Sequence, residues 1–504
     1  MTDLHSLQTL RSQALTAAWR DDPCDDICID SWRLLRQHNQ LPAHALKRLQ
    51  NMAESILPAA RSALYQGAVV NRSEQLPALH MALRAADPER FLPAATATEV
   101  LVGRQRMLQL ADGLHHGRDG NERKITDIIH IGIGGSDLGP RLLLQALTAK
   151  QRPVNEQVPS LHFMSGPKLD WPTLRARLDP ATTQVIVVSK SLGTTETLFN
   201  WQQLRAWQRL PELVVTAAPQ RALAMGISRQ QILPLWPWVG GRYSFASAVS
   251  LSAAAAIGSD QFEAVLAGAA AMDQHFLQQP VAANLPVQMA LLDFWNHCIR
   301  RFPARGVFTY HPGLQLLSNW LQQLEMESNG KRVDQSGRCL QLPSAALLFG
   351  GDGPQSQHAM FQSLHQGQRD WPLELIGVMP QPGNDAMRLL LAQLLGQWES
   401  LHQGDDQPDP ARALPGQRPV TAMLLPDLSA HTLGRLLAAY EHKTFTLASL
   451  IGCNPFDQWG VEAGKRSTAR IVKALSDQPS GSSSDAKASL SRKLQQVLDW
   501  LQVG

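Results

Sequence analysis

The chain has 504 residues, of which 44% are hydrophobic and 18% charged, and its formal net charge is only +3. This composition is that of a globular protein with room for two or three domains, and it excludes a disordered or fibrous chain. The slight charge, without a long basic block interleaved with aromatic residues, argues against nucleic acid as a partner.

The amino-terminal sequence lacks the charged start and apolar stretch of a signal peptide, and no apolar run approaches the ~20 residues of a bilayer span. We therefore expect a cytoplasmic protein that does not associate with membranes. Five cysteines spread over the chain argue against a disulfide framework. Cys24 and Cys28 have no second Cys or His pair at zinc-site spacing, so we expect no metal.

In chain order, residues 1–85 are rich in helix-forming residues and predict a helical extension. Residues 124–140 then predict a strand, a glycine turn and a helix; the segment from Val185 repeats this pattern, and the segment from Glu212 repeats it more weakly. Apolar strands that alternate with helical segments indicate an α/β fold with a doubly wound parallel sheet. We assign this first α/β domain to residues 86–260.

A second set of apolar strands begins near Ser344, Glu374 and Val420, and predicts a second α/β domain over residues 261–475. Residues 476–504 then combine a flexible Ser- and Gly-rich linker with a helix. That helix should be amphipathic, because apolar residues recur in it at helical spacing, namely Leu490, Leu494, Val497, Leu498 and Leu501.

The glycine turn raises the question of a dinucleotide site. The pattern G-x-G-x-x-G from Gly132 would require glycine at position 137, where Asp137 stands, and the P-loop ending is also missing. Gly134 and Gly135 still let a ligand approach the main chain closely, and Ser136 adds a hydroxyl group. The turn therefore fits a small phosphorylated ligand better than a dinucleotide.

A turn rich in hydroxyl groups follows the second apolar strand and includes Ser189, Ser191 and Thr194. Free N–H groups and the positive end of the helix dipole meet at such a turn, where hydroxyls add neutral donors around an anion. The turn indicates a phosphate site, with an ordinary helix cap as the alternative. Both turns follow parallel strands, so we expect them to face one crevice.

A candidate general base lies in GLQLLSNWLQQLEMESNGKR, residues 313–332. An apolar stripe that Glu327 continues, with Gln323 one turn earlier on the same face, is formed by Leu314, Leu317, Leu321 and Leu324. The Asn-Gly pair at 329–330 indicates the helix end, which places Glu327 in the last turn. An inward, partly desolvated carboxylate suits general-base catalysis, although an ion pair with Lys331 at a frayed helix end is the alternative.

Six segments resemble, in order and spacing, the signature segments of the glucose-6-phosphate isomerase family. They are IGIGGSDLGP, SKSLGTTET, WVGGRYS, QQLEMESNGK, SQHAMFQSLHQG and YEHKTFTLASLIGCNPFDQWGVEAGK. The resemblance extends from about residue 67 to about residue 465. It implies two doubly wound sugar-isomerase (SIS-type) domains with helical terminal extensions.

The resemblance also implies the reaction, the reversible isomerisation of glucose 6-phosphate and fructose 6-phosphate in glycolysis and gluconeogenesis, without a metal or redox cofactor. Glu327 would move the proton between C1 and C2, and Arg242 would stabilise the enediolate. His358, reaching across from the partner subunit of a homodimer, and Lys465 would open the sugar ring. The implied substrate-binding residues are Gly135, Ser136, Ser189, the main chain of Lys190, Ser191, Thr194, Gln323 and Gln458.

The chain departs from the family pattern at three places. Leu76 and Pro77 replace the usual Arg-Ala, Ser-Leu-Gly at 191–193 replaces the more usual Thr-Phe-Thr, and GPQSQH differs ahead of its serine. These changes bear on loop geometry and affinity more than on reaction type.

Several alternatives remain open. Taken singly, Arg242 could be a surface ion-pair residue, His358 a helix-start residue and Lys465 a solvated lysine. For the whole chain, the alternatives are a broader isomerase that also accepts mannose 6-phosphate and a non-catalytic module that binds sugar phosphates.

Overall fold

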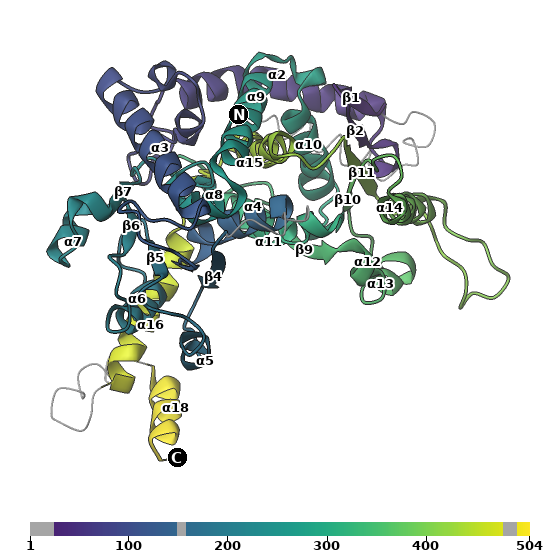
Figure 1. Ribbon diagram of the computed structural model, residues 1–504. Helices are drawn as coiled ribbons and strands as arrows, with labels where there is room; N and C mark the ends of the chain where they lie inside the picture. Colours follow the sequence, from purple (N-terminus) through teal and green to yellow (C-terminus); the bar gives the residue numbers. More distant parts are fainter. Residues whose placement is uncertain (1–24, 149–157, 477–490, 504) are drawn as a thin grey trace. The chain divides into compact units, whose positions relative to one another are not determined.

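The computed structural model describes residues 25–148, 158–476 and 491–503. The chain divides into two compact units, Met1–Phe456 and Asp457–Gly504. The first unit contains two β-sheets with helices around them (Figure 1). This arrangement confirms the α/β fold class predicted from the alternation of strands and helices.

The first sheet consists of five parallel strands in the order β4-β3-β5-β6-β7. Their bounds are β3 Asp127–Ile131, β4 Ser160–Met164, β5 Thr183–Val188, β6 Leu213–Thr216 and β7 Ile232–Pro234. All six residues of β5 are buried, as expected for a central parallel strand covered on both faces. The sequence analysis predicted β3, β5 and β6, whereas β4 and β7 are edge strands that it did not predict.

The second sheet has the order β1-β2-β11-β10-β8-β9. Its parallel strands are β8 Ala304–Tyr310, β9 Leu347–Asp352, β10 Leu373–Val378 and β11 Val420–Leu425. At one edge, an antiparallel hairpin of β1 Ile27–Ile29 and β2 Trp32–Leu35 pairs with β11. The sequence analysis described this part of the chain only as helical; these strands of three and four residues are too short to produce a clear alternating pattern.

The helices of the first unit cover both sheets and join them (Figure 1). Their bounds are α2 Ala43–Tyr65, α3 Ala94–His115, α4 Leu138–Thr148, α5 Trp171–Arg175, α6 Thr195–Arg205, α7 Pro219–Ala224, α8 Leu251–Ile257, α9 Ser259–Gln278, α10 Leu285–Asp293, α11 Leu317–Leu321, α12 Gly353–Gln357, α13 Phe361–Gln366, α14 Asp385–Gln403 and α15 Ala430–Ile451.

Helices α9 and α15 approach each other closely, and two glycines make this possible. A Cβ atom added at Gly434 would lie 2.0 Å from the Val265 carbonyl oxygen, and one at Gly268 would lie 1.9 Å from that of His431. No larger residue fits at either position. Nearly every residue of α15 is buried as a result, and the helix forms the centre of the first unit.

The second unit contains α16 Trp459–Ser476 and α18 Arg492–Val503. Helix α18 confirms the predicted carboxy-terminal helix, on which Val497 is 50% exposed. The predicted linker falls largely on residues 477–490, which lie outside the described residues, as does Cys24.

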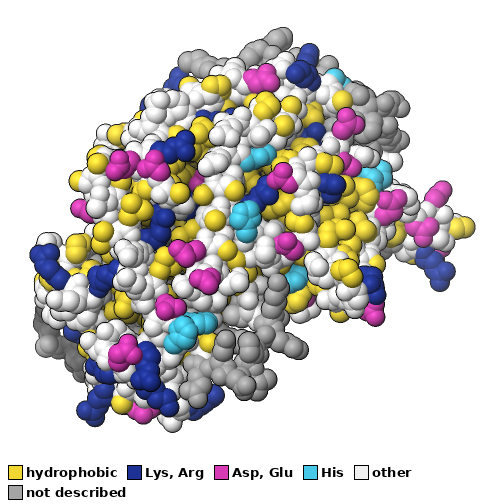
Figure 2. All heavy atoms as spheres, turned by 45° about the horizontal axis from the view of Figure 1, so that its top comes forward, with side chains coloured by type: hydrophobic (Ala, Val, Ile, Leu, Met, Phe, Trp, Pro, Cys, Tyr) yellow, Lys and Arg dark blue, Asp and Glu magenta, His cyan; other side chains and the backbone are white. Residues whose placement is uncertain are grey.

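Two surface properties bear on the kind of partner expected. Within the described ranges, no helix combines the length and apolar character required to cross a membrane. Figure 2 shows basic and acidic side chains interspersed on the face it draws, without a continuous basic stripe.

Sheet topology fixes where a ligand can bind. In the first sheet the chain runs outward from β3 to β4 on one side and from β5 to β7 on the other, so the strand order reverses between β3 and β5. In parallel α/β sheets, ligands bind beyond the carboxyl ends of the strands at such a reversal. The glycine turn follows β3 and the hydroxyl turn follows β5, so both lie at this point.

Candidate active site

The glycine turn, residues 134–136, packs directly against the loop that carries Arg242. A Cβ atom on Gly135 would lie 2.2 Å from the Gly241 carbonyl group and 2.7 Å from the Arg242 main-chain nitrogen. Gly134 has φ = 60°, and a Cβ atom there would lie 2.9 Å from the side-chain nitrogen of Gln323. Only glycine permits these approaches, and they bring together three segments that are far apart in sequence.

His130 holds the glycine turn through a hydrogen bond to its last residue, Ser136. It is fully buried in β3; its Nε2 lies 2.7 Å from the Ser136 carbonyl oxygen and its Nδ1 lies 2.7 Å from the Ser252 hydroxyl. With the proton on Nε2, the ring donates to Ser136 and accepts from Ser252. Asp137, which occupies the position of the third dinucleotide glycine, accepts a hydrogen bond of 2.7 Å from Arg141 Nε.

Burial lowers the pKa of His130 to about 4, and this shift predicts a pH-dependent stability. As pH falls, the unfolded chain binds the histidine proton near pH 6.5, before the folded chain does. The free energy of unfolding should therefore fall between about pH 6.5 and pH 4, by about 3 kcal/mol from this one residue. Denaturant unfolding at pH 7.5 and 5.0 should show a smaller decrease for His130→Gln than for the wild type.

The exposed His116, the C-cap residue that follows α3, provides the matched control for this experiment. His116→Gln should keep the wild-type pH dependence, because its side chain is 68% exposed. An equal pH dependence in wild type and His130→Gln would show that His130 does not titrate as its burial requires.

In the hydroxyl turn, the hydroxyl groups of Ser189 and Thr194 do not cap the following helix. Ser189 is 3% exposed, and its Oγ atom has no hydrogen-bond partner in the described structure. Thr194 is the N-cap residue of α6, but its side chain makes no capping hydrogen bond. Leu192 has φ = 47° and is fully buried, whereas its neighbours Ser191 and Gly193 are exposed. These features favour the phosphate site over the ordinary helix cap.

The side chain of Lys190 serves the neighbouring loop. Its Nζ donates hydrogen bonds of 2.8 Å to the carbonyl oxygens of Pro237 and Val239, and burial lowers its pKa. The hydroxyl turn is thus tied to the segment just ahead of Gly241 and Arg242. This agrees with a ligand role for the Lys190 main chain alone.

The helix that carries Glu327 changes its winding at the site. After α11, residues Gln322–Glu327 form a π-helical turn, and the helix ends at Asn329, as predicted. The leucines of the predicted apolar stripe are fully buried, while the Glu327 side chain is 17% exposed. Single π turns occur often at functional sites because they redirect side chains. The buried Oε1 atom of Gln323 in this turn has no partner among the described residues.

Arg242 is buried, not a surface ion-pair residue. Its side chain is 2% exposed, and Nη1 lies 3.7 Å from Glu327 Oε1. Its Nε donates to Ser328 Oγ and its Nη2 to the Pro455 carbonyl oxygen, both at 2.6 Å. Tyr243 OH lies 2.9 Å from the same Ser328 hydroxyl. The guanidinium group is therefore held rigidly beside the carboxylate.

The alternative for Glu327 was an ion pair between its carboxylate and Lys331, but Lys331 has a different role. Its Nζ donates a hydrogen bond of 2.9 Å to the main-chain carbonyl oxygen of Glu327, as suits a cation at a helix end. The ion pair of the Glu327 carboxylate is with Arg242.

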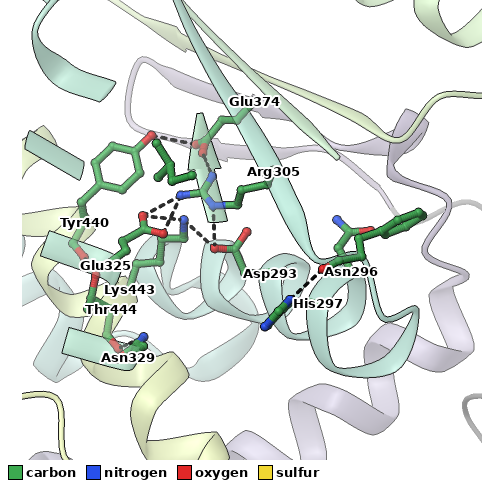
Figure 3. A network of polar contacts seen from close by, with 12 residues as sticks. Asp293, Asn296, His297, Arg305, Glu325, Asn329, Glu374, Tyr440, Lys443 and Thr444 are labelled. Atoms are coloured by element: carbon green, nitrogen blue, oxygen red, sulfur yellow. Dashed lines mark hydrogen bonds and ion pairs between the residues drawn. The ribbon is translucent and has the colours of Figure 1, made fainter. Parts of the chain in front are cut away.

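A buried ionic network underlies the π turn (Figure 3). Its centre is Arg305 on β8, which donates to both carboxylate oxygens of Glu325 at 2.6 and 2.7 Å and to Glu374 at 2.9 Å. Lys443 on α15 bridges Glu325 and Asp293 at 3.1 and 2.7 Å. Burial alone would raise the pKa of Asp293, but Arg305 and Lys443 hold it below its usual value. Glu325, two residues before Glu327, is thereby fixed in place.

The loop with Leu76 and Pro77 is well defined despite its departure from the family pattern. A bridge pairs Asn71 with Leu76, and Asn454 Nδ2 donates to Asn71 Oδ1 at 3.0 Å. The loop is thus fastened to the segment that ends at Phe456, close to the Pro455 carbonyl group that holds Arg242.

The structure does not bring every predicted site residue together. His358 is exposed and follows the end of α12, where its main-chain N–H donates to the Gln355 carbonyl oxygen at 3.1 Å; it is not a helix-start residue. Lys465 lies in the second unit on α16, 51% exposed, with its Nζ 2.7 Å from Glu462 Oε1. Gln458 also belongs to that unit.

Sequence reasoning missed several residues that shape this site. Ser328 lies inside a quoted motif, yet nothing in its pattern revealed that its hydroxyl joins Arg242 to Tyr243. His130 is a lone histidine in an apolar strand, which usually indicates only a satisfied core residue. Within the described ranges, no group of three or more His, Cys, Asp or Glu side chains is arranged to hold a metal ion.

The chain is similar to known proteins over most of its length. The family model described as phosphoglucose isomerase matches residues 37–490. The glucose-6-phosphate isomerase of Stenotrophomonas maltophilia is 41% identical over 445 residues, which cover 86% of this chain and 85% of that protein. The glucose-6-phosphate isomerase of Xanthomonas euvesicatoria pv. vesicatoria is 40% identical over 452 residues, covering 88% and 86%.

A solved structure extends the similarity to the whole fold. The crystal structure of a glucose-6-phosphate isomerase from Chlamydia trachomatis is similar with a TM-score of 0.83 and 27% sequence identity, covering 99% of both chains. With a family match over most of its length and relatives at about 40% identity, the chain belongs to the phosphoglucose isomerase family.

Proposed function

We infer that the protein interconverts glucose 6-phosphate and fructose 6-phosphate, a reaction of glycolysis and gluconeogenesis. The observation that carries this conclusion is the Glu327 carboxylate, 3.7 Å from the buried guanidinium of Arg242, whose loop packs against the glycine turn and is hydrogen-bonded to the hydroxyl turn. A base, a fixed cation and a remote anion anchor are what an aldose–ketose isomerisation through an enediolate requires.

The proposed reaction begins with the open-chain sugar. Glu327 removes the C2 proton of the aldose and returns a proton to C1, because the planar cis-enediolate exposes both carbons to one carboxylate. Arg242 stabilises the negative charge of the enediolate without giving up its own proton. Its bonds to Ser328 and Pro455 hold it in that position before substrate arrives.

The phosphate group supplies orientation from a distance. Ser189, Ser191, Thr194 and the Lys190 main chain are the proposed phosphate ligands, with the sugar beside Gly135 and Ser136. The unpartnered hydroxyl of Ser189 supports this role, because a phosphate oxygen would complete its hydrogen bonding. Binding a non-reacting group in this way can contribute several kcal/mol to positioning.

Ring opening and assembly form one proposal. His358 and Lys465 would transfer the proton at the ring oxygen, with Gln458 beside them, and Gln323 would face the sugar. We propose a cytoplasmic homodimer in which His358 serves the partner's site; its exposure at the end of α12 supports this role.

The division into domains also remains a proposal. Residues 86–260 would form the domain with the phosphate turns, and 261–475 the domain with the catalytic residues, between extensions 1–85 and 476–504. The strands support this division, because the first sheet uses only residues 127–234, whereas the second sheet, apart from its hairpin, uses residues 304–425.

A direct assay tests the proposed reaction. Purified protein with a chelator present should convert fructose 6-phosphate to glucose 6-phosphate, because the proposed steps use only side chains of the protein. Folded protein that binds the sugar phosphate without turnover would instead indicate the non-catalytic binding module.

A further inference from the structure

A cation stands at the hydroxyl turn that none of the sequence motifs includes. Arg221 on α7 donates a hydrogen bond of 3.0 Å from Nη1 to the Ser191 carbonyl oxygen. A Cβ atom built on Gly193 would lie 3.4 Å from this same Nη1 and 3.4 Å from the Ser191 hydroxyl. The guanidinium group therefore borders the space beside Gly193, which has no side chain to fill it.

The charge of Arg221 is not neutralised by the protein. Its side chain is exposed, and the group that it contacts at the turn is the uncharged Ser191 carbonyl. Lys190, the cation within the turn itself, directs its ammonium group to the Pro237 and Val239 carbonyl groups. Arg221 therefore offers its charge to an anion at this turn.

A second observation independently indicates a ligand at this turn. The Ser189 hydroxyl is buried and has no hydrogen-bond partner in the described structure, so it can donate a hydrogen bond to a bound ligand. A sugar-phosphate dianion presents several acceptor oxygens, and guanidinium groups bind phosphate through paired N–H donors.

We propose that Arg221 is a ligand of the substrate phosphate and supplies a charged donor beside Gly193, which has no side-chain donor. The proposal rests on the proposed function for the identity of the substrate, but its chemistry requires only a phosphate at the turn. Arg221 acts in binding, remote from the reacting carbons, so its removal should weaken substrate binding more than it slows turnover.

The test compares Arg221→Gln and Arg221→Lys with Arg229→Gln. Arg229 is exposed and precedes β7, so it lies at the amino ends of the parallel strands, whereas the hydroxyl turn lies at their carboxyl ends; its substitution matches the change in charge. For Arg221→Gln we expect the KM for fructose 6-phosphate to rise about tenfold to hundredfold, with kcat within about threefold of wild type. The dissociation constant for inorganic phosphate should rise similarly, and Arg221→Lys should recover part of both losses.

The two possible failures are distinguishable. If the wild type does not isomerise fructose 6-phosphate, the proposed function fails, while weaker binding of inorganic phosphate by Arg221→Gln still supports the ligand role. If Arg221→Gln binds inorganic phosphate as tightly as Arg229→Gln, the proposal is overturned, whether or not the protein is an isomerase.

Discussion

Glu327→Gln should lower kcat for fructose 6-phosphate by at least about a hundredfold, with KM little changed. The amide keeps the shape of the side chain in the π turn but cannot accept the C1 proton of fructose 6-phosphate, so only the chemical step is lost. Steady-state kinetics with a coupled assay for glucose 6-phosphate would measure both constants.

Glu54→Gln is the matched control for this variant. Glu54 is an exposed residue of α2, so the same chemical change there should leave both kinetic constants at wild-type values. If Glu327→Gln keeps more than about a tenth of the wild-type kcat, another group is the base.

Arg305→Met should cost about 3–5 kcal/mol of the free energy of unfolding. The change leaves the carboxylates of Glu325, Glu374 and Asp293 buried with only Lys443 as a cationic partner, and unpaired buried charges are among the most costly defects. Urea unfolding at pH 7.5 would measure the loss.

An exposed arginine controls for the loss of charge. Arg388 on α14 is 55% exposed and pairs with Asp385, so Arg388→Met should change the free energy of unfolding by no more than about 0.5 kcal/mol. A loss below about 1 kcal/mol for Arg305→Met would mean that the network relaxes or admits water when its central cation is removed.

Much of the fold was predictable because its central strands are simple in sequence. β5 (TQVIVV) and β11 (VTAMLL) are mostly apolar runs bounded by turn residues, as buried parallel strands usually are. β8 was missed although it is equally buried, since it reads ARGVFTY and contains Arg305, whose charge is matched only by residues distant in sequence. Tertiary partners of this kind leave no local signal.

The candidate site divides in the same way. The sequence indicated Glu327 as an inward carboxylate near a helix end, and the structure confirms its position but winds the segment as a π turn. The ties that fix Arg242 through Ser328 and Pro455 join segments more than 80 residues apart, and periodicity carries no information about them. Arg221 escaped notice because its relevance appears only beside Gly193.

In the proposed mechanism, Glu327 moves a proton between C1 and C2 of the sugar. Its most direct test is nuclear magnetic resonance of glucose 6-phosphate incubated with the enzyme in D2O until equilibrium with fructose 6-phosphate is reached. Wild-type protein should progressively replace the C2 proton by deuterium, and Glu327→Gln should do so at least about a hundredfold more slowly. Equal rates of C2 deuteration with wild-type protein and with Glu327→Gln would contradict it, because a group other than Glu327 would then move the proton.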